Sequence, residues 1–168
     1  MDPFVAIDFE TATESPDSAC AVGLVRAENG RIVRRESSLI RPPSRDFTFT
    51  WLHGIAWEDV RHAPPFGRLW PRLLPLLEGA AFLAAHNARF DRKVLRACCR
   101  RAGLEPPPLP FRCTVSLARQ VWGIRPTRLP DVCRALGIPL RHHDALSDAE
   151  ACARIAIAAL KVLPGASP

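Results

Sequence analysis

The sequence predicts a mixed α/β domain in which one central sheet is flanked by helices. Short apolar runs with strand character come first along the chain, and segments with helical periodicity follow them. Proline clusters at 42–43, 64–65 and 106–110 separate these segments, as expected of residues that end helices and strands. The length of 168 residues suits one domain, which we place at 1–163, with a short C-terminal tail at 164–168.

The N-terminal part is expected to form an antiparallel meander of three strands. The first strand is the run FVAIDFE at residues 4–10, whose last residues alternate between apolar and acidic. Two more strands are expected at 19–26 and 32–40, because the turn signal Glu28-Asn29-Gly30 separates two stretches with strand character.

Helices and short strands are expected in the rest of the chain. After a loop with one short helix at 57–60, apolar spacing predicts a helix at 66–77 that is kinked by its internal prolines. A strand at 80–85 and a helix that ends near Gly103 then form a crossover unit. The remaining expected elements are a strand at 111–113 and helices at 114–121, 130–136 and 149–160.

Composition narrows the class of protein. The formal charge of +6 and the pI of about 9.5 favour a polyanionic partner, with a basic surface that binds no ligand as the alternative. The six cysteines are irregularly spaced, so we interpret them as reduced and find no spacing typical of structural zinc. No apolar stretch approaches the ~20 residues of a membrane span, and the N-terminus does not resemble a signal peptide. A soluble, cytoplasmic protein without membrane contact is expected.

Two acids lie at the end of the first expected strand. Asp8 and Glu10 are two residues apart, so both side chains leave the same face of the sheet. Adjacent carboxylates in a largely buried strand repel each other unless a cation compensates them, and hard oxygen ligands suit Mg²⁺ or Mn²⁺. The alternative is a strand that has simply reached solvent.

Two more acids open expected helices. Asp91 follows the strand at 80–85, where Asn87 is a candidate N-cap, and Asp148 begins the last helix, which Asp144 or Ser147 could cap. Singly, each acid is explained as a first-turn residue that favours the helix dipole. A histidine pair at 142–143 precedes Asp148. The combination of four acids in three segments with a histidine indicates a catalytic site.

Three motifs together resemble those of the DnaQ-like 3'→5' exonucleases, the family of the DNA polymerase III epsilon subunit's catalytic domain. They are DFET at 8–11, HNARFD at 86–91 and the H-x-x-x-x-D spacing from His143 to Asp148. The histidine indicates the DEDDh subclass, and LHGI at 52–55 resembles a further segment near the substrate. The resemblance spans residues 3–160 or thereabouts. It implies a ribonuclease H-like mixed sheet, an antiparallel meander plus parallel strands, flanked by helices.

The resemblance also implies roles for individual residues. Asp8, Glu10, Asp91 and Asp148 would ligate two divalent metal ions, Mg²⁺ or Mn²⁺, with His143 as the general base. The pocket for the terminal nucleotide would be lined by Thr11, Ala12, Leu52, His53, Asn87 and Phe90. The implied reaction is two-metal-ion hydrolysis of nucleic acid from a free 3' end, with DNA favoured, which releases 5'-nucleoside monophosphates.

Two departures from the family pattern qualify this resemblance. Ala56 stands where the family often has a threonine that caps the next helix. No polymerase-binding tail is seen, which favours a stand-alone nuclease. The alternatives are an exoribonuclease acting on short RNA or RNA 3' ends and a catalytically silent nucleic-acid-binding module. Only a contact to the 2'-hydroxyl separates DNA from RNA, and no residue reveals one.

Overall fold

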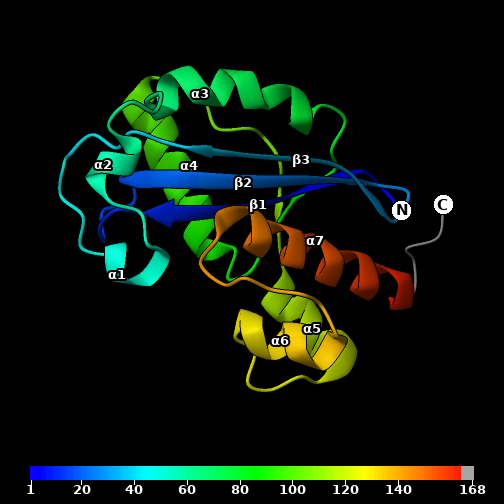
Figure 1. The fold of residues 1–168 in the computed structure, drawn as a ribbon. Coiled ribbons are helices and arrows are strands. Elements are labelled where there is room, and N and C mark those ends of the chain that lie inside the picture. The colour runs from blue at the N-terminus through cyan, green and yellow to red at the C-terminus, as the bar shows by residue number, and fades with distance from the viewer. Residues whose placement is uncertain (164–168) are drawn as a thin grey trace.

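A five-stranded mixed sheet forms the centre of the computed structural model, which describes residues 1–163 (Figure 1). The tail expected at 164–168 lies outside the described residues. The strand order is β3-β2-β1-β4-β5; the first three strands pair antiparallel, and β4 and β5 run parallel to β1. The predicted fold class is therefore confirmed. The strands are β1 (Phe4–Thr11), β2 (Ala19–Glu28), β3 (Arg31–Leu39), β4 (Leu83–Ala85) and β5 (Phe111–Cys113).

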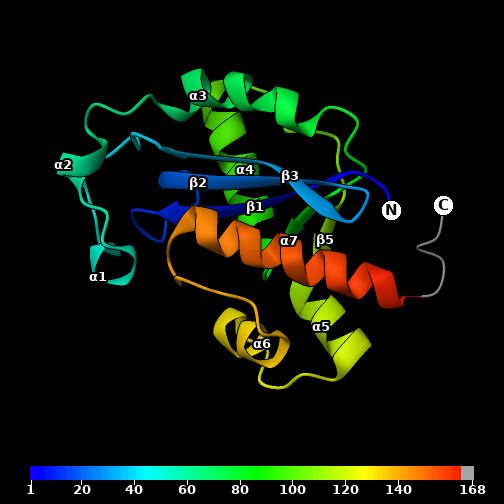
Figure 2. The ribbon, with the colours of Figure 1, turned by 45° about the vertical axis from the view of Figure 1, so that its right-hand side comes forward.

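Helices cover both faces of the sheet (Figures 1 and 2). One face carries α3 (Phe66–Leu73), the 3₁₀ helix η1 (Leu74–Leu77) and α4 (Arg89–Ala102). The other face carries α7 (Ala145–Val162), against which α5 (Thr114–Trp122) and α6 (Leu129–Leu136) pack. The short helices α1 (Thr50–His53) and α2 (Trp57–Val60) lie near the C-terminal end of β1.

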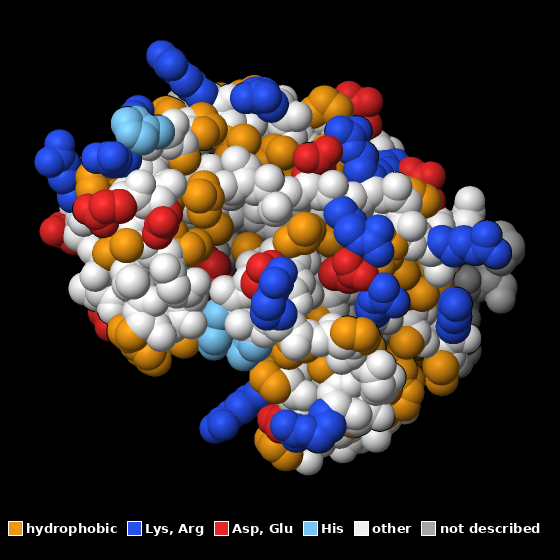
Figure 3. Space-filling view, viewed as in Figure 1, with side chains coloured by type: hydrophobic (Ala, Val, Ile, Leu, Met, Phe, Trp, Pro, Cys, Tyr) orange, Lys and Arg blue, Asp and Glu red, His pale blue; other side chains and the backbone are white. Residues whose placement is uncertain are grey.

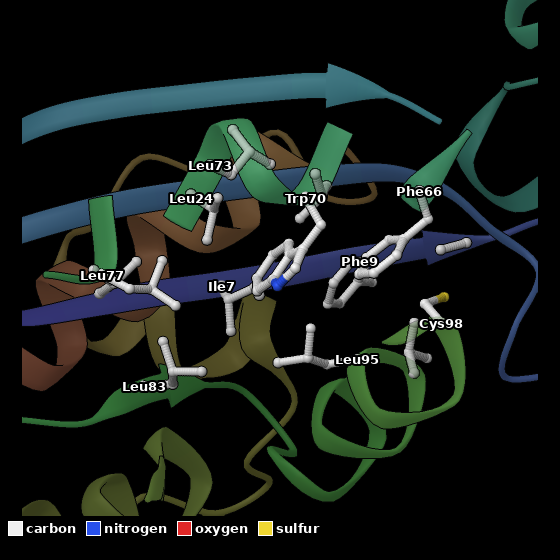
Figure 4. Packing of buried hydrophobic residues seen from close by; sticks show 14 of the residues in the cluster. Ile7, Phe9, Leu24, Phe66, Trp70, Leu73, Leu77, Leu83, Leu95 and Cys98 are labelled. Carbon is white, nitrogen blue, oxygen red and sulfur yellow. The ribbon is translucent and has the colours of Figure 1, made fainter. Parts of the chain in front are cut away.

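The central strand β1 is buried on both sides, which explains its nearly continuous apolar sequence. Ile7 and Phe9 point into the cluster formed with α3 and α4, where Trp70 stacks on Phe66 with ring centroids 5.4 Å apart (Figure 4). Phe4 and Ala6 point into the cluster under α7. Because side chains alternate along a strand, Asp8 and Glu10 continue the α7 side of β1.

Several element boundaries differ from those expected. The helix predicted at 66–77 becomes 3₁₀ from Leu74 onward, where Pro75 removes a backbone donor from the α-helical ladder. The last helix begins at Ala145, four residues before the predicted start, and α1 was not predicted. None of the helices that the structure describes is both long and apolar enough to cross a bilayer. The compartment stays a prediction.

Close contact between β2 and α7 depends on Gly23. A Cβ atom at this position would overlap the backbone carbonyl of Ala145 at the start of α7. We expect Gly23→Ala to lower the free energy of unfolding by about 3 kcal/mol, because neither backbone segment can move without disturbing the sheet. Gly67→Ala is the control, since its Cβ would meet only Ala102, with the Ala102 Cβ at 3.2 Å and its Cα at 4.0 Å. Equal denaturation midpoints for the two variants would contradict this account.

Candidate active site

Three carboxylates from two distant segments meet beside the C-terminal half of β1. Asp8 and Glu10 leave the α7 side of the strand, and Asp148 lies in the first turn of α7. One carboxylate oxygen from each of these three residues lies within 4.8 Å of the other two. The close approach of Ala145 to Gly23 brings the start of α7 to the sheet and thereby positions Asp148.

The fourth predicted acid, Asp91, is not part of this group of three and is 1 % exposed. On the edge of β1 that faces β4, the Val5 N–H donates to Phe82 O. Strand β4 ends at Ala85. The Phe9 N–H, two pairs further along that edge, therefore has no strand partner, and it donates to Asp91 Oδ1 at 3.1 Å. Asp91 thus completes the hydrogen bonding of β1 from the first turn of α4.

Burial raises the pKa values of all four acids, and neighbouring negative charges add to this effect. Burial is the larger cause of the raised pKa of Asp8, followed by the charges of Asp91, Asp148 and Glu10. Burial and the charge of Asp148 raise the pKa of Glu10 to about 7, and burial raises the pKa of Asp91 to about 8, against two backbone hydrogen bonds. Burial also raises the pKa of Asp148, with the neighbouring His142 acting in the opposite direction.

This donor set fits a divalent cation. Asp148 Oδ1 is buried and accepts no hydrogen bond from the residues that the structure describes, although its partner oxygen accepts two. An unsatisfied buried carboxylate oxygen is costly unless a donor or a cation meets it. Carboxylates alone are ligands typical of Mg²⁺ and Mn²⁺ rather than of softer metals.

Both histidines of the pair at 142–143 reach the acids. His142 Nδ1 lies 2.8 Å from Asp148 Oδ2, and the backbone N–H of His143 donates to the same oxygen at 3.1 Å. His143 adopts a φ of 64°, and its ring stacks on that of His142. Burial, His142 and His53 lower the pKa of His143. Of the two candidate caps of α7, Asp144 takes the position and accepts from Ser147 N.

A cavity of about 230 Å³ opens beside the acids. Four of the six predicted nucleotide contacts line it: Thr11, Leu52, His53 and Phe90. Phe49 lines it as well and was not predicted; its only sequence signal is an apolar residue shortly before the LHGI segment. Figure 3 shows a group of histidine side chains below the centre of the face that carries α7.

The other two predicted contacts do not line this cavity. Ala12 is buried; its N–H donates to Ser18 O, and its carbonyl accepts from Thr48 N and Phe49 N. Asn87 is exposed with a φ of 62°, and the N-cap of α4 is Ala88, without a side-chain hydrogen bond. The prediction that Asn87 caps this helix was wrong, because the left-handed residue is needed to turn the chain from β4 into α4.

His53 holds the α1 segment against β1. Its Nε2 donates to Thr11 O at 3.0 Å, and its Nδ1 accepts from Ile55 N at 3.1 Å. Burial lowers the pKa of His53, which favours the neutral ring that this pairing requires. Ala56 offers no side-chain cap to α2, but Asp59 Oδ2 accepts from Ala56 N at 2.8 Å. This bond replaces part of the missing threonine cap.

His86, the first residue of the HNARFD motif, joins three segments of the chain. Its Nδ1 accepts from the Thr114 hydroxyl at 2.8 Å, and its Nε2 donates to Thr127 O at 2.9 Å. We expect His86→Ala to lower the free energy of unfolding by about 2 kcal/mol, because both partners are buried and each loses its hydrogen bond to His86. Thermal or denaturant unfolding measures this loss. His62→Ala, at an exposed histidine, is the control, and a similar loss there would show that the bonds at His86 do not matter.

Comparisons with known sequences agree on one protein family. A family model described as an exonuclease matches residues 5–156. The DNA polymerase III PolC-type protein of Thermotoga petrophila is 32% identical over 157 residues, which are 90% of this chain and 11% of that protein. The 3'-5' exonuclease DinG of Bacillus subtilis is 34% identical over 168 residues, 95% of this chain and 18% of that protein. The chain thus spans less than a fifth of the length of these relatives.

Solved structures share the fold. Exonuclease X in complex with 5' overhanging duplex DNA superposes with a TM-score of 0.75 at 25% identity, covering 94% of this chain and 91% of that one. The nuclease domain of 3'hExo, a DEDDh family member bound to rAMP, gives a TM-score of 0.81 at 22% identity, covering 95% and 92%. The expected ribonuclease H-like architecture of this group is confirmed.

Proposed function

The chain belongs to this exonuclease family, and we propose that it is a metal-dependent 3'→5' exonuclease that acts on DNA. The observation that carries the proposal is the meeting of Asp8, Glu10 and Asp148 within 4.8 Å, with a buried Asp148 oxygen that has no donor among residues 1–163. Repulsion within such a group of acids lowers the stability of the fold, and a bound cation removes that repulsion. A silent binding module would have no need to retain these acids.

Asp8, Glu10, Asp91 and Asp148 would hold two divalent ions, Mg²⁺ or Mn²⁺. When bound, such ions neutralise the charge of a phosphodiester and lower the pKa of water. The chain's own contribution is to fix the ligand oxygens: β1 carries two of the acids, Asp91 is held by the Phe9 N–H, and Asp148 is held by the His143 N–H. These two backbone bonds each fix one oxygen of Asp91 and of Asp148.

His143 would accept the proton of the attacking water. Its lowered pKa keeps the ring neutral near pH 7, the form that takes up a proton. The hydroxyl oxygen of the water forms the new bond to phosphorus, and the 3'-oxygen of the preceding nucleotide leaves. The product is a 5'-nucleoside monophosphate and a strand shortened by one residue.

The cavity would hold the terminal nucleotide. Leu52 and the 42 % exposed Phe90 offer apolar surface to a base, and His53 fixes the segment that carries Leu52. A base stacked on an aromatic ring is held with little regard to its identity. DNA is favoured because Exonuclease X is seen with DNA and the PolC-type relatives are named as DNA polymerases.

The test uses 5'-labelled single strands of DNA and RNA of one sequence with Mg²⁺, with Mn²⁺ and with a chelator. We expect a ladder that shortens from the 3' end, faster on DNA, and no cleavage in the chelator. Faster cleavage of RNA would replace DNA by RNA as the substrate. His143→Ala should lower the rate by about 10² to 10⁴, the range typical of a positioned base. If His142→Ala showed this loss and His143→Ala did not, the base would be His142 instead.

A further inference from the structure

We propose that the outward face of α4 binds the phosphates of the strand upstream of the 3' end that is being cleaved. This basic face consists of Arg89, Arg92, Lys93, Arg96 and Arg100. The inference rests on the proposed function for the identity of its ligand, and it adds a surface that holds the rest of the strand.

Helical geometry puts these five cations on one side of α4. At 3.6 residues per turn they fall within an arc of about 100°. All five are exposed. The buried residues of the helix, which are Asp91, Val94, Leu95, Cys98 and Cys99, lie on the opposite side and pack into the sheet. The single acid of α4 thus points inward, and the outward face carries positive charge alone.

The cations of the basic face have no acidic partner in the part of the chain that the structure describes. Some arginines elsewhere do have one: Arg35 and Arg154 both pair with Glu150, and Arg34 pairs with Glu36. Figure 3 shows the face that carries α7, where basic and acidic side chains are mixed. The view in Figures 1 and 2 places α4 behind the sheet, away from that face.

This arrangement is unfavourable for the isolated helix in two ways. Arg89 and Arg92 lie in the first turn, where the positive end of the helix dipole repels cations. Three like-charge pairs follow at the i, i+4 spacing, from Arg89 to Lys93, from Arg92 to Arg96 and from Arg96 to Arg100. A row of phosphates relieves both kinds of repulsion at once, because it supplies negative charge at each step along the face.

The basic face starts at the candidate active site. Arg89 stands next to Phe90, which lines the cavity, and two residues before Asp91. From Arg89 to Arg100 the helix advances roughly 16 Å, at 1.5 Å per residue. A stacked strand carries one phosphate per 3.4 Å, so this length matches about five phosphates. When the last nucleotide of a strand occupies the cavity, the nucleotides upstream of it can lie along this continuous positive surface.

The experiment compares two double variants that lose equal charge. R96Q/R100Q removes the distal part of the basic face, and R31Q/R72Q removes two exposed arginines without an ion pair among the described residues. Glutamine keeps the helix propensity of arginine. Binding of a fluorescent 12-nucleotide DNA single strand is measured by anisotropy in a chelator at several salt concentrations. The Michaelis constants (KM) for the 12-mer and for a dinucleotide are then measured with Mg²⁺.

We expect R96Q/R100Q to bind the 12-mer roughly tenfold more weakly and to lower the slope of log K against log salt by about 1.4, or about 0.7 for each lost contact. The KM of R96Q/R100Q for the 12-mer should exceed that of R31Q/R72Q by a similar factor. The KM for the dinucleotide, which ends before Arg96, should be the same in both variants. The melting temperature of R96Q/R100Q should not fall, because the change removes like-charge repulsion.

Equal affinities and equal salt slopes for the two variants would overturn the inference. So would weaker binding of a glutamate 12-mer by R96Q/R100Q with unchanged DNA binding, which would assign the basic face to an acidic protein. Failure of the proposed function is a separate result: the wild-type protein would then cleave no substrate with either metal, while the salt slopes in the chelator would still decide whether the basic face binds DNA.

Discussion

Asp8→Asn is expected to lower metal-dependent cleavage by at least about 10³-fold while making the metal-free protein more stable. Asparagine keeps the shape of the side chain but removes the charge that would hold a cation, so the electrostatic contribution of the site is lost. The same change removes a carboxylate whose pKa is raised by its burial and by the charges of four other acids. The two measurements are the initial rate on a labelled single strand and the melting temperature in a chelator.

A matched substitution separates this effect from a general one. Asp131→Asn replaces an acid of α6 that pairs with Arg134 on the surface, away from the cavity residues. Its rate should equal that of the wild type, and its melting temperature should change little, because exposed pairs contribute up to about 1 kcal/mol. If Asp8→Asn retained activity, Asp8 would not be a ligand. If Asp8→Asn were less stable than the wild type in the chelator, repulsion among the acids would not be the dominant effect of Asp8 in the metal-free protein.

In the metal-free protein, the contribution of the site's acids to stability should fall as the pH rises from about 4 to about 8. The folded state raises the pKa of Glu10 to about 7 and that of Asp91 to about 8, so it retains protons that the unfolded chain has released. A state that binds more protons is favoured at low pH, and its advantage disappears as the pH rises. For Glu10 alone the shift from 4.5 to about 7 corresponds to about 3 kcal/mol, at 1.36 kcal/mol per pKa unit.

Mg²⁺ or Mn²⁺ should offset this loss, because a cation favours the ionised acids. The rise in melting temperature on adding the metal should therefore be small at pH 5 and large at pH 8. Melts at several pH values, each with metal and with a chelator, measure the difference. In Glu10→Gln the dependence on pH should be shallower than in the wild type. A metal effect of the same size at pH 5 and pH 8 would contradict the assignment of these acids as ligands.

The local pattern of the chain was sufficient to predict most elements and the pairing of Asp8 with Glu10 on one face. Both follow from periodicity, since a strand repeats every two residues and a helix every 3.6. The positions of the cations on one side of α4 follow from the same rule. The family resemblance added the roles of the acids and of His143, which the geometry of the site supports as a proposal.

Long-range packing decided the rest. The four residues of α1 form no periodic signal, and the segment is held by a bond from His53 to Thr11 O, 42 residues away along the chain. Asn87 suits a helix cap by its residue type, yet it adopts a left-handed turn that lets Asp91 reach the free Phe9 N–H. That N–H is free only because β4 ends at Ala85.

The sequence by itself therefore determined which side chains share a face, because that depends on neighbours a few residues apart. Only the tertiary structure decided which faces meet: the contact of α7 with Gly23 brings Asp148 to Asp8, and the direction of α4 starts its basic face at the cavity. The physical reason is that a local period sets the direction of a side chain, whereas the packing of backbones from distant segments sets its distance from another.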